Sequence, residues 1–140
     1  LSAIFLAINQ LNEPVILPLH PRTRLALEQQ GIKLKAHIYP IEPLGYCTMI
    51  ALEKHARVIL TDSGGMQKEA YWLSTPCITL RDETEWIETV AAGWNLLVGA
   101  DTATILRAVD TFCSPIERPT LYGDGYAAER AVGILNKLEK

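Results

Sequence analysis

Apolar residues recur along this chain with two alternating periods. Short apolar runs, typical of strands buried on both faces, alternate with stretches in which apolar residues recur every three or four positions, typical of amphipathic helices. The predicted strands cover residues 15–19, 36–39, 58–60, 77–81 and 94–98. The predicted helices cover residues 1–12, 22–30, 46–56, 66–74 and 85–92, and two more follow Asp101 and Gly125.

Strands that alternate with helices through short loops predict an α/β fold, here a doubly wound, Rossmann-like parallel sheet. The length of 140 residues is that of a single domain. Gly31 and Gly93 follow the ends of predicted helices, as helix-terminating glycines do. Ligands of such sheets bind beyond the carboxyl ends of the strands. We therefore expect the functional residues in four loops at that edge, residues 20–22, 40–46, 63–65 and 81–85.

The stretch from Val58 to Ala70 carries the most informative pattern. A buried strand runs into Ser63-Gly64-Gly65, and a helix follows directly. Free N–H groups and the positive end of the helix dipole would then point at one spot, which favours a phosphate. Glu69 lies four residues after Gly65 on the same helical face, where it could accept hydrogen bonds from a sugar diol. The alternative is a tight turn followed by a solvated carboxylate, because two glycines after a strand are a weak motif.

Other groups at this edge also have two interpretations. Arg81 suits a phosphate by its planar fork, or it forms an ion pair with Asp82 or Glu85. His20 could donate a hydrogen bond to a phosphoryl group, or it serves only as a turn residue before Pro21. The tryptophans are expected to pack rather than to stack on a base; they are Trp72, Trp86 and Trp94.

Composition and charge exclude several classes of function. A net charge of −3 without a basic cluster argues against nucleic acid as a partner, and no apolar run has the length of a membrane span. Neither the dinucleotide-binding glycine pattern nor the P-loop pattern is present, and no metal-ligand spacing appears, so we expect no cofactor and no metal. Cys47, Cys77 and Cys113 are odd in number and far apart, which fits buried thiols in a reducing cytoplasm.

The chain opens at Leu1 without methionine, inside a helical pattern that has no capping residue. We therefore expect a fragment of a longer protein. From the residues alone, the prediction is a cytoplasmic α/β domain that binds a phosphorylated, sugar-bearing nucleotide.

Several motifs resemble those of the non-hydrolysing UDP-N-acetylglucosamine 2-epimerases. They follow the family's order and spacing over essentially all 140 residues. The motifs are Thr61-Asp62-Ser63-Gly64-Gly65-Met66-Gln67-Lys68-Glu69-Ala70, His20-Pro21-Arg22-Thr23, Glu42-Pro43-Leu44-Gly45-Tyr46, Arg81-Asp82-Glu83-Thr84-Glu85-Trp86, Glu88-Thr89-Val90, Gly93-Trp94-Asn95 and Tyr122-Gly123-Asp124-Gly125-Tyr126-Ala127-Ala128-Glu129-Arg130.

The resemblance implies the GT-B architecture, two doubly wound domains that face each other across a cleft, with this chain as the C-terminal, nucleotide-binding one. It implies that Ser63, Gly64 and Gly65 hold the diphosphate and that Glu69 takes the ribose hydroxyls. Residues 40–46 and Met49 would line the uracil, although family members often carry an aromatic residue in place of that methionine.

The remaining implied site residues surround this core of the site. His20 would face the cleft, and Arg22 is a further substrate-binding cation at the same edge. Pro43 and Tyr46 belong to the loop that would line the uracil, and Arg81 and Glu85 would lie near the phosphates or stabilise their own loop. Some relatives carry an arginine at the position of Trp86.

The implied reaction inverts carbon 2 of the sugar through elimination and re-addition of UDP. The partners implied are UDP-GlcNAc or UDP, and the intact protein would be a homodimer. The acid and base carboxylates would lie in an N-terminal domain, so no catalytic residue is assigned here. This chain alone is expected to bind UDP weakly and not to epimerise.

Three alternatives remain open at this stage. The first is the hydrolysing branch of the epimerases, which releases UDP and the free sugar. The second is a GT-B glycosyltransferase, although the Arg81–Trp86 motif followed by Gly93-Trp94-Asn95 favours the epimerase. The third is a nucleotide-sugar sensing module without enzymatic activity.

Overall fold

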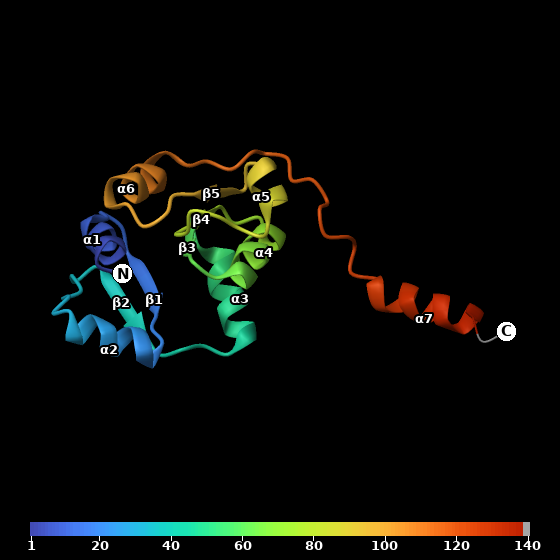
Figure 1. Cartoon of the computed structure of the whole chain (residues 1–140), viewed down its shortest axis with the longest axis horizontal. Helices are drawn as coiled ribbons and strands as arrows, with labels where there is room; N and C mark the ends of the chain where they lie inside the picture. Colours follow the sequence, from blue (N-terminus) through green and yellow to red (C-terminus); the bar gives the residue numbers. More distant parts are fainter. Residues whose placement is uncertain (139–140) are drawn as a thin grey trace.

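The structure, a computed structural model, describes residues 1–138, which form the helices and strands of Figure 1. Strands and helices alternate along the chain, as the apolar pattern predicts. In chain order they are α1 (Ser2–Gln10), β1 (Val15–Pro18), α2 (Pro21–Gln29), β2 (Ile38–Ile41), α3 (Tyr46–His55), β3 (Ile59–Thr61), α4 (Gly64–Leu73), β4 (Cys77–Thr79), α5 (Ile87–Ala91), β5 (Asn95–Leu97), α6 (Thr102–Thr111) and α7 (Ala127–Leu138).

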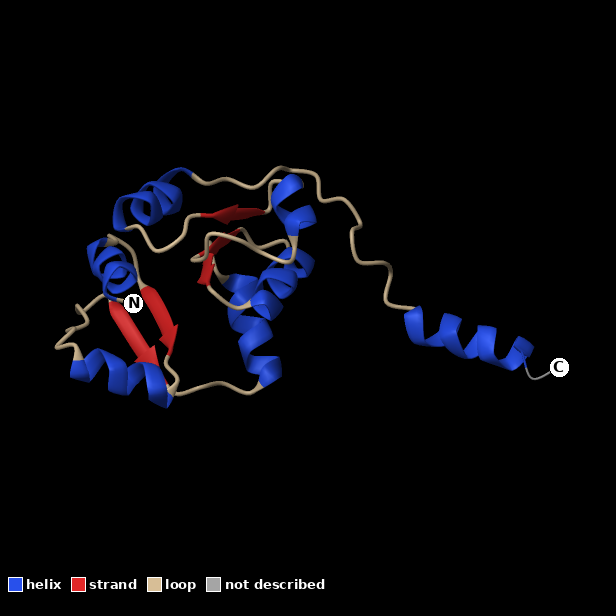
Figure 2. Ribbon diagram, viewed as in Figure 1, coloured by secondary structure: helices blue, strands red, loops and turns tan. Residues whose placement is uncertain are grey.

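All strand pairs are parallel, which confirms the α/β class. The hydrogen bonds divide the strands into two ladders, β1-β2 and β3-β4-β5, instead of one continuous ladder. Ile59 pairs with Cys77, and Cys77 pairs with Asn95, so the second ladder is in register across three strands. Between the β1-β2 ladder and α3 lies an apolar groove of about 860 Å³. Figure 2 shows helices α1 to α6 arranged around the strands.

One hydrophobic core joins the two ladders. Ala7 of α1 and Leu11, the residue after α1, pack with Ile78 of β4, and Ile105 and Val109 of α6 belong to the same cluster. Partly buried apolar residues pack against the same cluster, among them Val15 of β1 and Leu60 of β3. The helix predicted after Asp101, with Ile105, Leu106 and Val109 facing inward, therefore forms; Leu106 is only partly buried. Packing against this cluster holds β3 and β4 in place, and with them the loops at their carboxyl ends.

Element boundaries differ from the sequence prediction where proline and capping residues act. Helix α2 begins at Pro21 rather than Arg22, because proline fits the first helical position and His20 caps the helix. Strand β2 begins at Ile38 and continues through Pro40. It is an edge strand, where a residue without an N–H is tolerated. Gly93 ends α5 with a φ of +74°, as predicted for a helix terminator.

The predicted burial of the cysteines is wrong for two of the three. Cys77 of β4 is buried, but Cys47, near the start of α3, and Cys113, after α6, are exposed. All three are free thiols. Of the tryptophans, Trp94 is buried and packs edge-to-face on Tyr71, whereas half of Trp72 is exposed.

Helix α7 extends away from the rest of the molecule (Figure 1). An irregular segment from Phe112 to Tyr126 leads to it. The helix forms as predicted, but its apolar residues Val132, Ile134 and Leu135 are exposed. The sequence predicts one apolar face made of Ala128, Ala131, Val132, Leu135 and Leu138. The side chain of Leu138 lies outside the described part of the structure.

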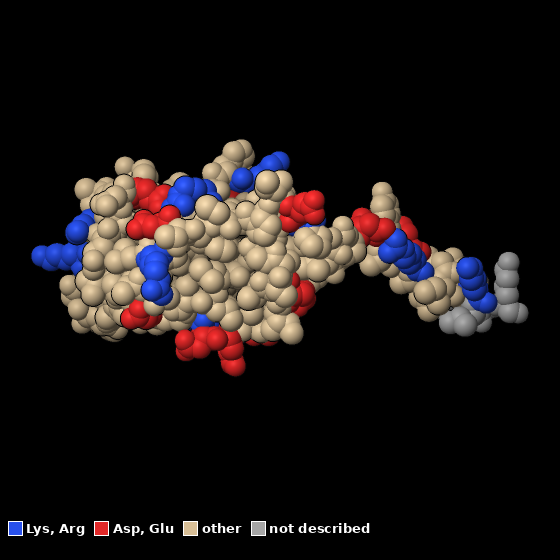
Figure 3. Space-filling model, turned by 90° about the horizontal axis from the view of Figure 1, so that it is seen from above, with Lys and Arg blue, Asp and Glu red and all other residues tan. Residues whose placement is uncertain are grey.

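Three surface and helix features bear on the kind of site that residues 1–138 can form: the distribution of charge, the length of the apolar helices and the grouping of possible metal ligands. Basic and acidic side chains are interspersed on the face shown in Figure 3. Within residues 1–138, no helix is long and apolar enough to cross a bilayer. The same residues contain no group of three or more His, Cys, Asp or Glu side chains placed to hold a metal ion.

Candidate functional site

The start of α4 forms a tight, capped turn at the carboxyl end of β3. The Ser63 N–H donates to Thr61 Oγ1 at 3.0 Å, and the Ser63 hydroxyl oxygen accepts from the Met66 N–H at 3.4 Å, which caps the helix. Gly64 and Gly65 are the first two helical residues, whose N–H groups have no partner inside the helix. Because Ser63 accepts through a lone pair, its O–H remains a donor. Three donors therefore meet at the positive end of α4.

The loop that follows β4 lies directly against this turn. A Cβ atom added to Gly64 would lie 3.3 Å from the indole Nε1 of Trp86 and 3.5 Å from Glu85 Oε2. Glycine at this position thus permits the close approach of the loop. The structure thus brings together residues 63–65 and residues 81–85, two of the four loops that the sequence places at one edge of the sheet.

Arg81 and Glu85 form an ion pair in this loop. Arg81 Nη2 lies 3.1 Å from Glu85 Oε1, and Arg81 Nη1 lies 3.3 Å from Glu85 Oε2. The hydrogen bond from Arg81 lowers the pKa of Glu85 below its usual value. Of the two interpretations of Arg81, the ion pair is present. Both side chains remain partly exposed, so the guanidinium also stays accessible to a phosphate.

A buried network of hydrogen bonds holds the loop that follows β4 against α4 and β5. Asn95 Nδ2 donates to Gln67 Oε1 at 2.9 Å and to Thr89 Oγ1 at 3.2 Å, and Asn95 Oδ1 accepts from Thr79 Oγ1 at 2.7 Å. Thr84 Oγ1 in turn donates to Gln67 Oε1 at 2.6 Å. The network joins α4, β4, β5 and the loop. The sequence analysis missed it; the only sequence signal is the polar residues at buried strand and helix positions.

An aromatic cage around Lys68 was also missed. The Lys68 Nζ lies 4.4 Å from the ring centroid of Trp86, 4.7 Å from that of Tyr122 and 5.1 Å from that of Trp72. An ammonium group over aromatic faces is a favourable cation–π arrangement. Tyr122 also packs edge-to-face on Trp72, Trp86 and Tyr71. The cage attaches the C-terminal segment to α4, close to the turn at residues 63–65.

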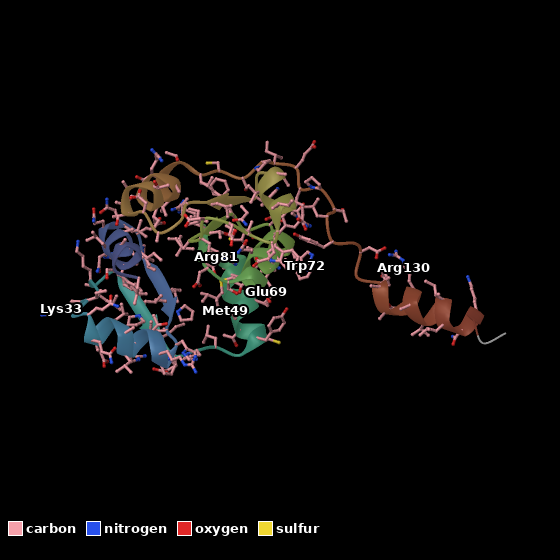
Figure 4. The ribbon with its side chains drawn as sticks, viewed as in Figure 1. Lys33, Met49, Glu69, Trp72, Arg81 and Arg130 are labelled. Carbon is pink, nitrogen blue, oxygen red and sulfur yellow. The ribbon has the colours of Figure 1, made fainter. Side chains whose placement is uncertain are left out.

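Glu69 lies one turn into α4, on the side of the helix that faces α3. It is half-buried, and Figure 4 shows it beside Met49 of α3, which is also half-buried. One turn further along α3, Glu53 is only 1% exposed, and neither of its carboxylate oxygens has a hydrogen-bond partner within residues 1–138. The sequence places Glu53 on the face of Met49 but assigns it no role.

The other predicted site residues lie at the carboxyl ends of β1 and β2. His20 Nδ1 accepts from the Arg22 N–H at 3.2 Å and so caps α2, which is the turn role considered for it. Arg22 and Pro43 are exposed, and Tyr46, the first residue of α3, is 68% exposed. In the described chain, no hydrogen bond or ion pair joins these four residues to the turn at residues 63–65.

Comparison with known proteins shows one consistent family. Residues 1–136 match the family described as UDP-N-acetylglucosamine 2-epimerase. The chain is 45% identical to a UDP-N-acetylglucosamine 2-epimerase homolog of Methanococcus maripaludis, over 99% of this chain and 40% of that protein. It is 43% identical to the UDP-2,3-diacetamido-2,3-dideoxy-D-glucuronate 2-epimerase of Pseudomonas aeruginosa, with the same coverage.

Solved structures agree with these sequence relations. The UDP-GlcNAc 2-epimerase of Methanocaldococcus jannaschii in complex with UDP-GlcNAc and UDP is similar, with a TM-score of 0.84 and 40% identity. That similarity covers 97% of this chain and 39% of the other. The chain thus spans about two fifths of the length of the proteins that it matches.

Proposed function

Because the chain belongs to the UDP-N-acetylglucosamine 2-epimerase family, we propose that it is the part of a UDP-sugar 2-epimerase that holds the UDP group. The observation that carries this proposal is the start of α4, where Ser63 caps a helix whose first two N–H groups, those of Gly64 and Gly65, have no partner inside the helix. Backbone donors and a helix dipole at one point form a site for a diphosphate. Residues 1–140 would then form one nucleotide-sugar-binding domain.

The ribose and the base would lie along the α3–α4 side of this turn. Glu69 follows Gly65 by one helical turn, so its carboxylate is within reach of two ribose hydroxyls when the diphosphate occupies the turn. Met49 lies beside Glu69 and offers an apolar contact for the uracil. Pro43 and Tyr46 come from the loop that leads into α3 and would close that side of the base.

Cations around the turn would balance the phosphate charge. Arg81 reaches the loop that contacts Gly64, and its partner Glu85 fixes the guanidinium there. His20 and Arg22 lie at the carboxyl end of β1, where we assign them to the cleft wall. No residue of this chain is assigned a catalytic role.

The proposed reaction is inversion at carbon 2 of the sugar. Elimination removes the proton on carbon 2 and breaks the bond between carbon 1 and the UDP oxygen, which leaves a double bond between carbons 1 and 2. Re-addition of UDP to carbon 1, with a proton delivered to the opposite face of carbon 2, gives the inverted sugar. Negative charge develops on the diphosphate as UDP leaves, and donors fixed before the reaction stabilise it. This task suits the start of α4, and the acid and base groups would come from the rest of the protein.

The UDP-linked diacetamido glucuronate sugar is a second candidate substrate and should be assayed beside UDP-GlcNAc. The relatives named for UDP-GlcNAc and for the diacetamido glucuronate sugar are 42% and 43% identical to this chain. Similarity at this level does not separate them, and the residues assigned here contact the UDP group common to both. We therefore propose a UDP-linked 2-acetamido sugar as the substrate class, with UDP-GlcNAc as the first member to assay.

The location and assembly of the whole protein are proposals as well. Three free thiols support a reducing cytoplasm. A homodimer of the intact protein is testable by sedimentation equilibrium of the gene product, where a monomer at micromolar concentration would contradict it.

The test of the nucleotide site is calorimetric titration with UDP. Saturable binding by the wild-type chain, weakened at least tenfold in Glu69→Ala and unchanged in the exposed control Glu28→Ala, is the expected result. The loss of one charge-assisted contact pair accounts for a change of that size. Equal affinity of wild type and Glu69→Ala would refute the assignment of Glu69.

The titration should be repeated on the full-length gene product. Binding there but not in the 140-residue chain would show that the other cleft wall supplies much of the affinity. Absence of UDP binding in both folded proteins would refute the proposed function. Product analysis by NMR, with UDP-GlcNAc as substrate, distinguishes epimerisation from hydrolysis and from transfer to an acceptor.

A further inference from the structure

Glu53 is a carboxyl group buried between α3, α4 and β4. Its side chain is 1% exposed, and both oxygens lack a hydrogen-bond partner within residues 1–138. Its own backbone carbonyl accepts a hydrogen bond from Thr75 Oγ1 at 3.0 Å, which fixes this turn of α3 against the start of β4. An isolated ionised carboxylate in such a place costs much free energy, so burial favours the neutral acid.

Glu53 lies near enough to Glu69, the residue assigned to the ribose, for the charge of Glu69 to act on its carboxyl group. Met49 and Glu53 are one helical turn apart on the face of α3 that packs on α4, and Glu69 lies beside Met49 on the facing side (Figure 4). We propose that Glu53 is a positioning residue of the UDP site: a neutral carboxylic acid behind Glu69 that leaves the negative charge on Glu69, where the ribose hydroxyls bind. This inference rests on the proposed function.

The groups around Glu53 raise the pKa of its carboxyl group and so favour its neutral form. Burial and the negative charge of Glu69 on α4 together raise the pKa of Glu53 to about 7. From β4, Cys77 faces Glu53, and burial raises the pKa of that thiol to about 12, so it stays neutral. On α3 itself, Lys54 and His55 are exposed, and His55 Nδ1 contacts the Ala51 carbonyl oxygen. None of the ion pairs formed by the described residues includes Glu53.

Nucleotide binding is therefore linked to the proton on Glu53. Ribose hydroxyls that donate to Glu69 exclude water from the space between α3 and α4, which disfavours a second negative charge there. The bound state thus holds the Glu53 proton more tightly than the free state. Above about pH 7 the free protein releases this proton to solvent, and binding must take it up again. Linkage then requires that UDP affinity falls as the pH rises through this range.

The test is calorimetric titration of the full-length gene product with UDP between pH 6.5 and 8.5. If binding raises the pKa of Glu53 by one unit, wild-type affinity falls about sixfold over this range relative to Glu53→Gln. Gln has nearly the same shape and cannot ionise, so the variant should keep its affinity at pH 8.5. The terminal phosphate of UDP titrates equally in both proteins. The matched control Glu28→Gln changes an exposed carboxylate of α2 and should follow the wild-type profile.

A second measurement needs no variant. Wild-type titrations at pH 8.0 in two buffers of different ionisation enthalpy report the protons taken up on binding, and a few tenths of a proton are expected. UDP itself is already ionised at this pH, because its terminal phosphate has a pKa of about 6. A purely packing role for Glu53 would change affinity in the variant without any proton uptake.

The outcomes separate the two proposals. Wild-type protein that binds no UDP at any pH refutes the proposed function. UDP binding with no proton uptake at pH 8.0 refutes the role of Glu53, and so do parallel pH profiles of wild type and Glu53→Gln. If the variant does not fold, the two-buffer measurement on wild type decides alone.

Discussion

Removal of the Asn95 side chain tests whether the buried polar network stabilises the fold around the loop that follows β4. Asn95 is 3% exposed and makes three side-chain hydrogen bonds, to Gln67, Thr79 and Thr89. A net contribution of about 1 kcal/mol for each bond predicts that Asn95→Ala lowers the free energy of unfolding by about 3 kcal/mol. For a chain of this size that corresponds to a fall in Tm of about 10 °C.

The assay is thermal unfolding followed by circular dichroism, with urea unfolding as a check on the free energy. Asn136→Ala on α7 is the matched control, because this asparagine is exposed and its loss should change stability by less than about 0.5 kcal/mol. A Tm for Asn95→Ala within about 2 °C of wild type would refute the reasoning. It would mean that the network contributes no net stability.

Three further predictions concern the site, the core and the buried acid. Gly64→Ala should weaken UDP binding about tenfold, because the added Cβ would lie 3.3 Å from Trp86 Nε1 and displace the loop. The control Gly133→Ala, whose Cβ meets open space, should leave the UDP affinity unchanged, and the same affinity in both variants would contradict the prediction. Ile78→Ala should lower the free energy of unfolding by about 3 kcal/mol in urea unfolding, because Ile78 is 0% exposed at the centre of the core; a loss below about 1 kcal/mol would show that the core refills the cavity. Glu53→Gln should stabilise the protein by about 3 kcal/mol at pH 8.5 and change its stability little at pH 4, because a pKa raised from 4.5 to about 7 makes the wild type lose stability as the pH rises from 4.5 to 7. An equal stability difference at pH 4 and pH 8.5 in urea unfolding would refute this reasoning.

The sequence predicts the β3–α4 unit well because its signals are local. A buried run, a capping residue and two glycines stand next to one another, so Ser63, Gly64 and Gly65 adopt the expected turn without help from distant segments. Helix ends are less predictable. Helix α4 begins at Gly64, two residues before the expected start, because Ser63 caps it and glycine is accepted in the first turn.

Contacts between distant segments are what local patterns cannot predict. Gln67 and Asn95 are 28 positions apart, and their hydrogen bond depends on the pairing of β4 with β5. Tyr122 reaches the cage of Lys68 from a segment that has no periodic pattern at all. The exposure of Cys47 likewise depends on what covers its side of α3, which the hydropathy of a thiol does not tell.

Helix α7 has a consequence for how the molecule opens in solution. An isolated helix of its length is marginal in water, and its apolar side chains Val132, Ile134 and Leu135 gain nothing from packing while they are exposed. Its amide protons should therefore exchange with deuterium orders of magnitude faster than those of α4 or β4, which open only when the core opens. Heat would melt α7 in a broad, early transition and the rest of the chain in a separate cooperative one.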